Sequence, residues 1–98
     1  MTRIEMPQPV EIPLIRQGYF KLRLTAQERI AIRQKAMEAT QEGAIVFDFM
    51  DLLNSESRIN LQQAEVQQGI GYLEQIGILD SGRANEILNT PLSDEEKA

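Results

Sequence analysis

The 98-residue chain contains no cysteine and no histidine, and these two absences remove much of the chemistry that proteins use. Without cysteine there is no disulfide and no thiolate nucleophile, and without both residue types zinc loses its usual sulfur and nitrogen ligands. Acid–base catalysis by imidazole is excluded as well. We therefore predict that the protein is not an enzyme and has no catalytic, metal-binding or cofactor-binding residue.

Long apolar runs are also absent. No stretch approaches the roughly 20 consecutive apolar residues that a membrane-spanning helix needs. Pro7, Pro9 and Pro13 interrupt the first apolar stretch, so the N-terminus does not have the uninterrupted core of a signal peptide. We expect no membrane association, and a chain without cysteine gives no sign of an oxidising compartment.

The chain does have enough apolar residues to fold. Leu, Ile, Val and Phe make up 27 of the 98 residues, which lies above the roughly 20% below which disorder is expected. The net charge of −5 is unevenly divided, because residues 1–40 carry a net +3 and residues 41–98 a net −8. This division favours head-to-tail association or two oppositely charged partners, although it also fits a domain with one basic and one acidic end.

Residues 1–15 have the pattern of an extended arm. Apolar side chains occupy even positions and prolines occupy odd ones, and proline cannot donate to a sheet ladder. The arm could lie across its own domain or a neighbouring molecule. Because residues 19–24 also alternate, a short β-hairpin between residues 10–15 and 19–24 is an open alternative.

The rest of the sequence predicts helices. Thr25 and Glu28 form a capping box that opens a helix over residues 25–39, and Gln41-Glu42-Gly43 separates it from a helix over residues 44–54. A third helix covers residues 62–76, with Gly77 as its left-handed C′ residue. Asp80 or Ser81 caps a last helix that ends near Asn89. The side chains expected to face inward are Ala26, Ile30, Ala36, Met37, Ile45, Val46, Phe49, Leu52, Leu53, Ile59, Leu61, Val66, Ile70, Leu73, Ile76, Ala84, Ile87 and Leu88.

These elements predict a mainly α fold: three to four short helices in a small orthogonal bundle, with an extended N-terminal arm or a short β-hairpin. We divide the chain into an arm (1–15), a helical domain (16–90) and a flexible acidic tail (91–98).

Two constellations resemble functional sites but have simpler explanations. Asp48 and Asp51 lie three residues apart on one helix face, yet that face should be solvated, and no further ligand is spaced to complete a metal site. Gly69 and Gly71 lie inside a helical pattern rather than between a strand and a helix, so a phosphate-binding loop is disfavoured. Close packing within the domain or against a partner helix explains them better.

Basic residues cluster between Arg16 and Lys35. They predict a surface for an acidic protein partner or an ordinary solvated face. Binding of nucleic acid through phosphate contacts is less favoured, because nucleic-acid-binding domains are typically strongly basic and this chain is acidic overall.

Several stretches resemble small bacteriophage and prophage proteins encoded near tail genes. They are LTAQERIAIR at residues 24–33, DFMDLLN at 48–54, GYLEQIGIL at 71–79 and RANEIL at 83–88, and the resemblance covers about residues 20–89. It implies a virion component or an assembly role, located in the bacterial cytoplasm or in the virion, and it implies no catalytic residue.

We therefore expect a non-enzymatic protein–protein interaction module, a phage tail component or a tail-assembly factor, whose partner is another copy of itself or a tail protein. The alternative is a small nucleic-acid-binding regulator that uses the basic face of residues 16–35. The residues expected to bind the partner are Ile4, Met6, Val10, Ile12, Leu14, Lys21, Arg23, Arg29 and Arg33.

Overall fold

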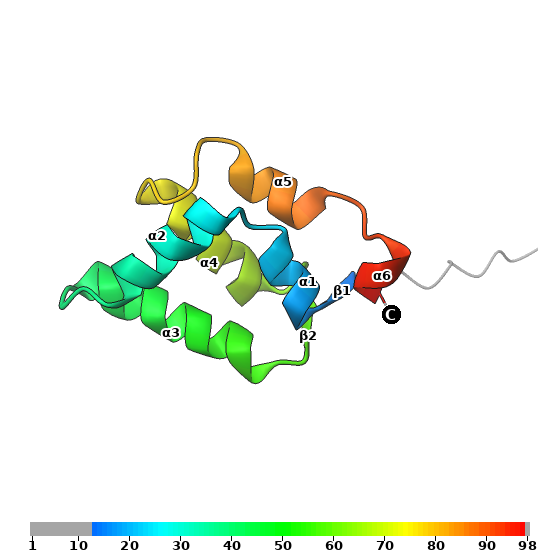
Figure 1. Cartoon of the computed structure of the whole chain (residues 1–98), viewed down its shortest axis with the longest axis horizontal. Coiled ribbons are helices and arrows are strands. Elements are labelled where there is room, and N and C mark those ends of the chain that lie inside the picture. Colours follow the sequence, from blue (N-terminus) through cyan, green and yellow to red (C-terminus); the bar gives the residue numbers. More distant parts are fainter. Residues whose placement is uncertain (1–12, 98) are drawn as a thin grey trace, which may run out of the picture.

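The computed structural model describes residues 13–97, which form six helices and a two-stranded antiparallel sheet (Figure 1). The fold is mainly α-helical, as the sequence predicted. No helix within residues 13–97 is both long and apolar enough to cross a membrane. The elements in chain order are β1 (Leu14–Arg16), α1 (Gln17–Leu22), α2 (Ala26–Ala36), α3 (Gln41–Ser55), β2 (Arg58–Asn60), α4 (Ala64–Gln75), α5 (Arg83–Asn89) and α6 (Asp94–Lys97).

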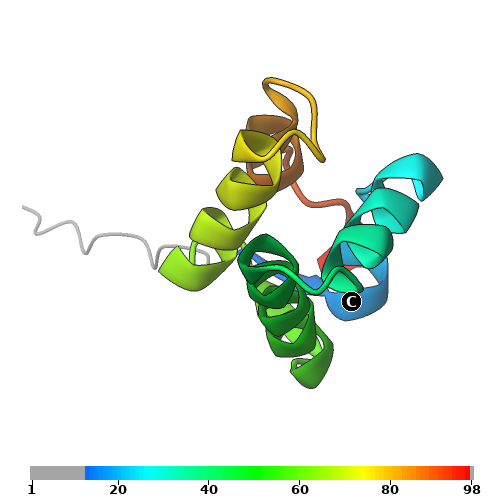
Figure 2. The ribbon, with the colours of Figure 1, turned by 90° about the vertical axis from the view of Figure 1, so that its left-hand side faces the viewer.

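One apolar core joins these elements. Seen end-on, α3 lies between α2 and α4 (Figure 2). Every described element except α6 contributes at least one buried apolar side chain. The buried residues are Ile15, Phe20, Leu24, Ile32, Val46, Phe49, Leu53, Ile59, Leu61, Val66, Ile70, Leu73, Leu79 and Ile87.

The sheet is not the hairpin that we considered. β1 pairs with β2, with Ile15 opposite Ile59, and residues 17–22 are helical instead of extended. Phe20 and Leu24 are buried four residues apart, so the apolar alternation of this stretch also fits one helix face. The alternation could not separate these two structures, because the choice depends on a partner strand far along the chain.

The described end of the predicted arm, residues 13–15, does not follow the apolar pattern that we expected. Ile15 is fully buried, whereas Leu14 is 39% exposed, so the apolar row on even positions does not continue inward through this strand. Ile4, Met6, Val10 and Ile12 lie outside the described residues.

The helix start at Thr25 is confirmed. The Thr25 hydroxyl accepts a hydrogen bond from the Glu28 backbone N–H (3.1 Å), and the Glu28 carboxylate accepts one from the Thr25 N–H (2.8 Å). The predicted inner face of this helix is only partly correct. Ala36 packs against the core, but Ile30 and Met37 are 57% and 81% exposed, and Ile32 is buried instead. Helix α2 packs mainly against α3, and Ile32 is its buried residue.

The connection from α2 to α3 lies three residues earlier in the chain than we predicted. Thr40 caps α3 by accepting a hydrogen bond from the Gly43 N–H (3.0 Å), so the stretch from Gln41 to Gly43 forms the first helical turn. A Cβ at Gly43 would lie 2.3 Å from the Glu38 carbonyl oxygen. Glycine is therefore needed where the end of α2 approaches the start of α3.

Helices α3 and α4 pack through a second glycine. A Cβ at Gly69 would lie 2.1 Å from the ring of Phe49, whereas at Gly71 nothing lies within 4 Å. Close packing explains Gly69, as expected, and nothing in the structure explains Gly71.

The end of α4 is the predicted left-handed cap. Gly77 has φ +85°, its N–H donates to the Glu74 carbonyl and the Ile78 N–H donates to the Leu73 carbonyl, which is the Schellman pattern. The start of α5 differs from the prediction, because neither Asp80 nor Ser81 caps it. The Glu74 carboxylate reaches across from α4 and accepts hydrogen bonds from the N–H groups of Gly82 (2.9 Å) and Ala84 (3.1 Å).

The C-terminal residues differ from the predicted flexible tail. Residues 94–97 form α6, which begins with a second capping box between Ser93 and Glu96. Helix α6 lies against β1, and Leu92 packs against the core.

Candidate functional site

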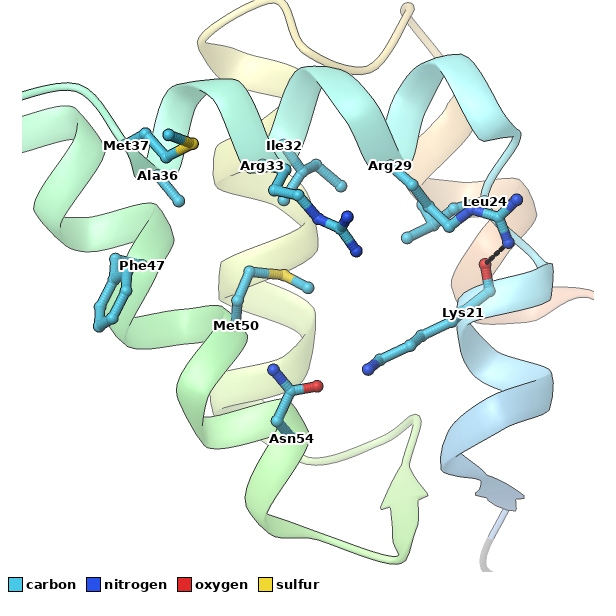
Figure 3. Close-up of a pocket in the computed structure, with 10 residues that line it drawn as sticks. All are labelled: Lys21, Leu24, Arg29, Ile32, Arg33, Ala36, Met37, Phe47, Met50 and Asn54. Atoms are coloured by element: carbon cyan, nitrogen blue, oxygen red, sulfur yellow. Dashed lines mark hydrogen bonds between the residues drawn. The ribbon is translucent and has the colours of Figure 1, made fainter.

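A hollow of about 240 Å³ lies between α1, α2 and α3 (Figure 3). Helix α1 and the turn after it form one wall, α2 forms the roof and α3 forms the opposite wall. We call it the α1–α3 groove. Its lining residues are Lys21, Leu24, Arg29, Ile32, Arg33, Ala36, Met37, Phe47, Met50 and Asn54.

The groove has an apolar lining that the fold does not fully cover. Leu24 and Ile32 are buried at its base, and Met50 is half-buried. Phe47 and Met37 are 62% and 81% exposed. Full burial of one such side chain stabilises a complex by roughly 1.5–3 kcal/mol, so a partner that covers Phe47 and Met37 would gain substantial free energy.

Three cations surround this apolar surface. Lys21 and Arg33 extend into the space in front of α3, and the Arg29 guanidinium donates a long hydrogen bond (3.5 Å) to the Lys21 carbonyl oxygen (Figure 3). None of the residues that line the groove is acidic. Within residues 13–97, no carboxylate forms an ion pair with any of the three. The groove therefore combines an apolar body with uncompensated positive charge.

Other basic residues nearby are paired. Lys35 contacts both Glu38 (3.0 Å) and Glu42 (3.1 Å), and these hydrogen bonds raise the pKa of Lys35. Arg83 contacts Glu28 at 2.7 Å, and this hydrogen bond lowers the pKa of Glu28. Neutralised in this way, these residues are not available to attract an anion.

The structure corrects the prediction that Arg23 is one of the residues that bind a partner. Its guanidinium donates to the Glu96 carboxylate (2.8 and 3.1 Å) and to the Ile87 carbonyl (2.7 Å), and its side chain is only 9% exposed. The hydrogen bond from Arg23 also lowers the pKa of Glu96. Arg23 thus joins the turn after α1 to α5 and α6 instead of facing a partner.

Leu14 is also separated from the basic residues. It lines a different hollow with Leu52 and Ile59, on the side of the sheet. Of the predicted partner-binding residues that are described, the structure brings together Lys21, Arg29 and Arg33, and it places Leu14 and Arg23 elsewhere.

Sequence reasoning missed Phe47 and misplaced Met37. One signal was present: α3 carries more apolar residues than a single buried stripe can hold. The core takes Val46, Phe49 and Leu53 and leaves Phe47 exposed. An excess of apolar residues on a helix indicates a second contact surface, and here that surface is one wall of the groove.

The acidic pair on α3 is exposed. Asp48 and Asp51 have solvent-exposed side chains, and no cluster of three or more acidic side chains suited to a metal ion occurs within residues 13–97.

Compared with known proteins, the chain matches no family model, no curated protein and no solved structure.

Proposed function

We propose that the protein is a non-enzymatic interaction module whose α1–α3 groove binds a segment of a protein partner that carries both apolar and acidic side chains. One observation carries this proposal. Three cations that have no carboxylate partner within residues 13–97 surround an apolar hollow, and its lining includes two strongly exposed apolar residues, Met37 and Phe47.

A protein partner fits this surface better than a nucleic acid does. Nucleic acid would use the cations for phosphate contacts and could stack a base on Phe47, but it would leave the aliphatic part of the lining without a matching group. The chain is also acidic overall, with a net charge of −5, which opposes the approach of a polyanion.

We propose that the protein acts in a phage tail, either as a component of the tail or as a factor in its assembly. This proposal rests on the resemblance of residues 20–89 to small phage proteins. In that setting the partner is a tail protein or a second copy of this chain, and the protein is present in the bacterial cytoplasm or in the virion.

The groove can be tested without knowing the natural partner. Peptides would be selected from a random display library on the wild-type protein, and their binding compared with the Arg33→Glu variant. The Arg16→Glu variant is the matched control, because Arg16 is exposed, carries the same charge and does not line the groove. We expect selected peptides to combine apolar residues with Asp or Glu, and to lose binding to Arg33→Glu only.

Two outcomes would reject the proposal. Selected peptides that bind both variants equally would place binding outside the groove. Tight binding of a short DNA duplex, lost by about 200 mM salt and absent in Arg33→Glu, would favour the nucleic-acid-binding regulator.

A further inference from the structure

We propose that the segment bound in the α1–α3 groove is the N-terminal arm, residues 4–12, of a neighbouring copy of this chain. This inference rests on the proposed function, because it names the segment that the groove binds.

The composition of residues 4–12 matches the groove. The segment carries four apolar side chains, Ile4, Met6, Val10 and Ile12, and two carboxylates, Glu5 and Glu11. The groove offers an apolar lining and three cations without a carboxylate partner within residues 13–97. The charges of the segment and of the groove are opposite, and both have apolar side chains that contact between them would bury.

The place where the arm joins the domain favours a neighbour over the same chain. The backbone is fixed at Pro13, whose carbonyl oxygen accepts a hydrogen bond from the Leu61 N–H (3.1 Å). β1 then leads directly into the N-terminal end of α1, whereas the groove lies at the other end of α1, around Lys21 and Leu24. The described chain therefore begins beside the end of α1 that does not line the groove.

The sequence of residues 1–12 disfavours the tight turn that would bring them along α1 to the groove of the same chain. Residues 1–12 contain no glycine. Pro7, Pro9 and Pro13 fix their own φ angles and restrict the residues before them to extended conformations. An extended segment of 12 residues spans up to about 40 Å, which is enough to reach an adjacent domain.

Cysteine cross-linking would test the contact directly, because the native chain has no cysteine to interfere. A Val10→Cys chain would be mixed with a Phe47→Cys chain and oxidised mildly. We expect a disulfide-linked pair that contains one chain of each kind. The matched control is Gln68→Cys on α4, which is exposed but does not line the groove, and it should give little of this product.

A charge exchange in the full chain would test the same contact without oxidation. Glu5→Lys with Glu11→Lys, or Arg29→Glu with Arg33→Glu, should each weaken self-association by about tenfold, because two ion pairs become two repulsive pairs. A chain that carries all four substitutions should regain it. Molar mass by light scattering over a concentration series measures this.

The proposal is overturned by cross-linking no stronger than that of Gln68→Cys, or by a wild-type chain that stays monomeric. If the library peptides still bind in the groove, either of these results would reject the arm as occupant and leave the proposed function standing. If the peptides fail as well, both are rejected.

Discussion

Two glycines in α4 show how the absence of a side chain can allow two helices to pack closely. Gly69 faces the ring of Phe49, where a Cβ would approach to 2.1 Å, and Gly71 has open space around its Cα. Glycine inside a helix costs roughly 1 kcal/mol relative to alanine, so only the contact at Gly69 offsets that cost.

The two glycines should respond to alanine with opposite signs. We expect Gly69→Ala to lower the free energy of unfolding by roughly 1–3 kcal/mol, because the buried Phe49 ring has to move. Gly71→Ala should raise it by up to about 1 kcal/mol through helix propensity. Urea denaturation of both variants measures the difference. Equal effects would mean that α3 and α4 do not approach each other as described.

Arg23 is the residue for which the prediction from the sequence and the observed contacts differ most. We expect Arg23→Ala to lower the free energy of unfolding by about 2 kcal/mol, because charge-assisted hydrogen bonds to Glu96 and to the Ile87 carbonyl are lost. Arg33→Ala is the control, and its effect should stay within about 0.5 kcal/mol because Arg33 is exposed. Similar losses of stability in the two variants would contradict a structural role for the contacts of Arg23 with Glu96 and Ile87.

At the scale of elements, helix α3 contributes side chains both to the core and to the α1–α3 groove. Its buried stripe holds α3 against α4, while Phe47 and Met50 line the groove on another side. Helix α2 is less well covered, because its contacts within the described chain are mainly with α3 and Ile30 and Met37 stay exposed. Apolar exposure on these two helices is the physical basis for expecting a partner there.

The two phenylalanines of α3 separate folding from binding. Phe49→Ala should lower the free energy of unfolding by roughly 3–5 kcal/mol, because it removes a buried aromatic side chain. Phe47→Ala should change it by less than about 1 kcal/mol and yet abolish binding of the selected peptides. A large loss of stability in Phe47→Ala would show that Phe47 supports the fold and would remove it from the proposed site.

At the scale of the whole molecule, two ion pairs join the beginning and the end of the chain. Glu28 of α2 pairs with Arg83 of α5, and Arg23 pairs with Glu96 of α6. Each pair lowers the pKa of its carboxylate below the ordinary value of 4.5. The folded state therefore holds fewer protons than the unfolded state near and below that pH.

Stability should consequently depend on acid in a defined window. The contribution of both pairs is fully present above about pH 5 and is lost as the pH falls through 4.5 towards the lower pKa values of the folded state. Denaturation at several pH values measures this. The double variant Glu28→Gln, Glu96→Gln should show a shallower decrease over the same window, and an unchanged slope would contradict the role of the two pairs.

The sequence by itself determined the features that depend on neighbouring residues. The capping box of Thr25 and Glu28 and the left-handed Gly77 were predicted at the positions where they occur, because hydrogen bonds within about four residues decide them. The buried stripe Val66, Ile70 and Leu73 followed from helical spacing for the same reason. The capping pattern at Ser93 and Glu96 was equally local, and it could have predicted α6.

Only the tertiary structure decided which distant segments meet. Ile15 pairs with Ile59 instead of with a neighbouring hairpin strand, and Arg23 finds Glu96 across 73 residues of sequence. The same contacts separate Arg23 from Lys21, Arg29 and Arg33, which the sequence placed together. The pairing of Arg23 depends on long-range packing, and no local pattern encodes its contact with Glu96.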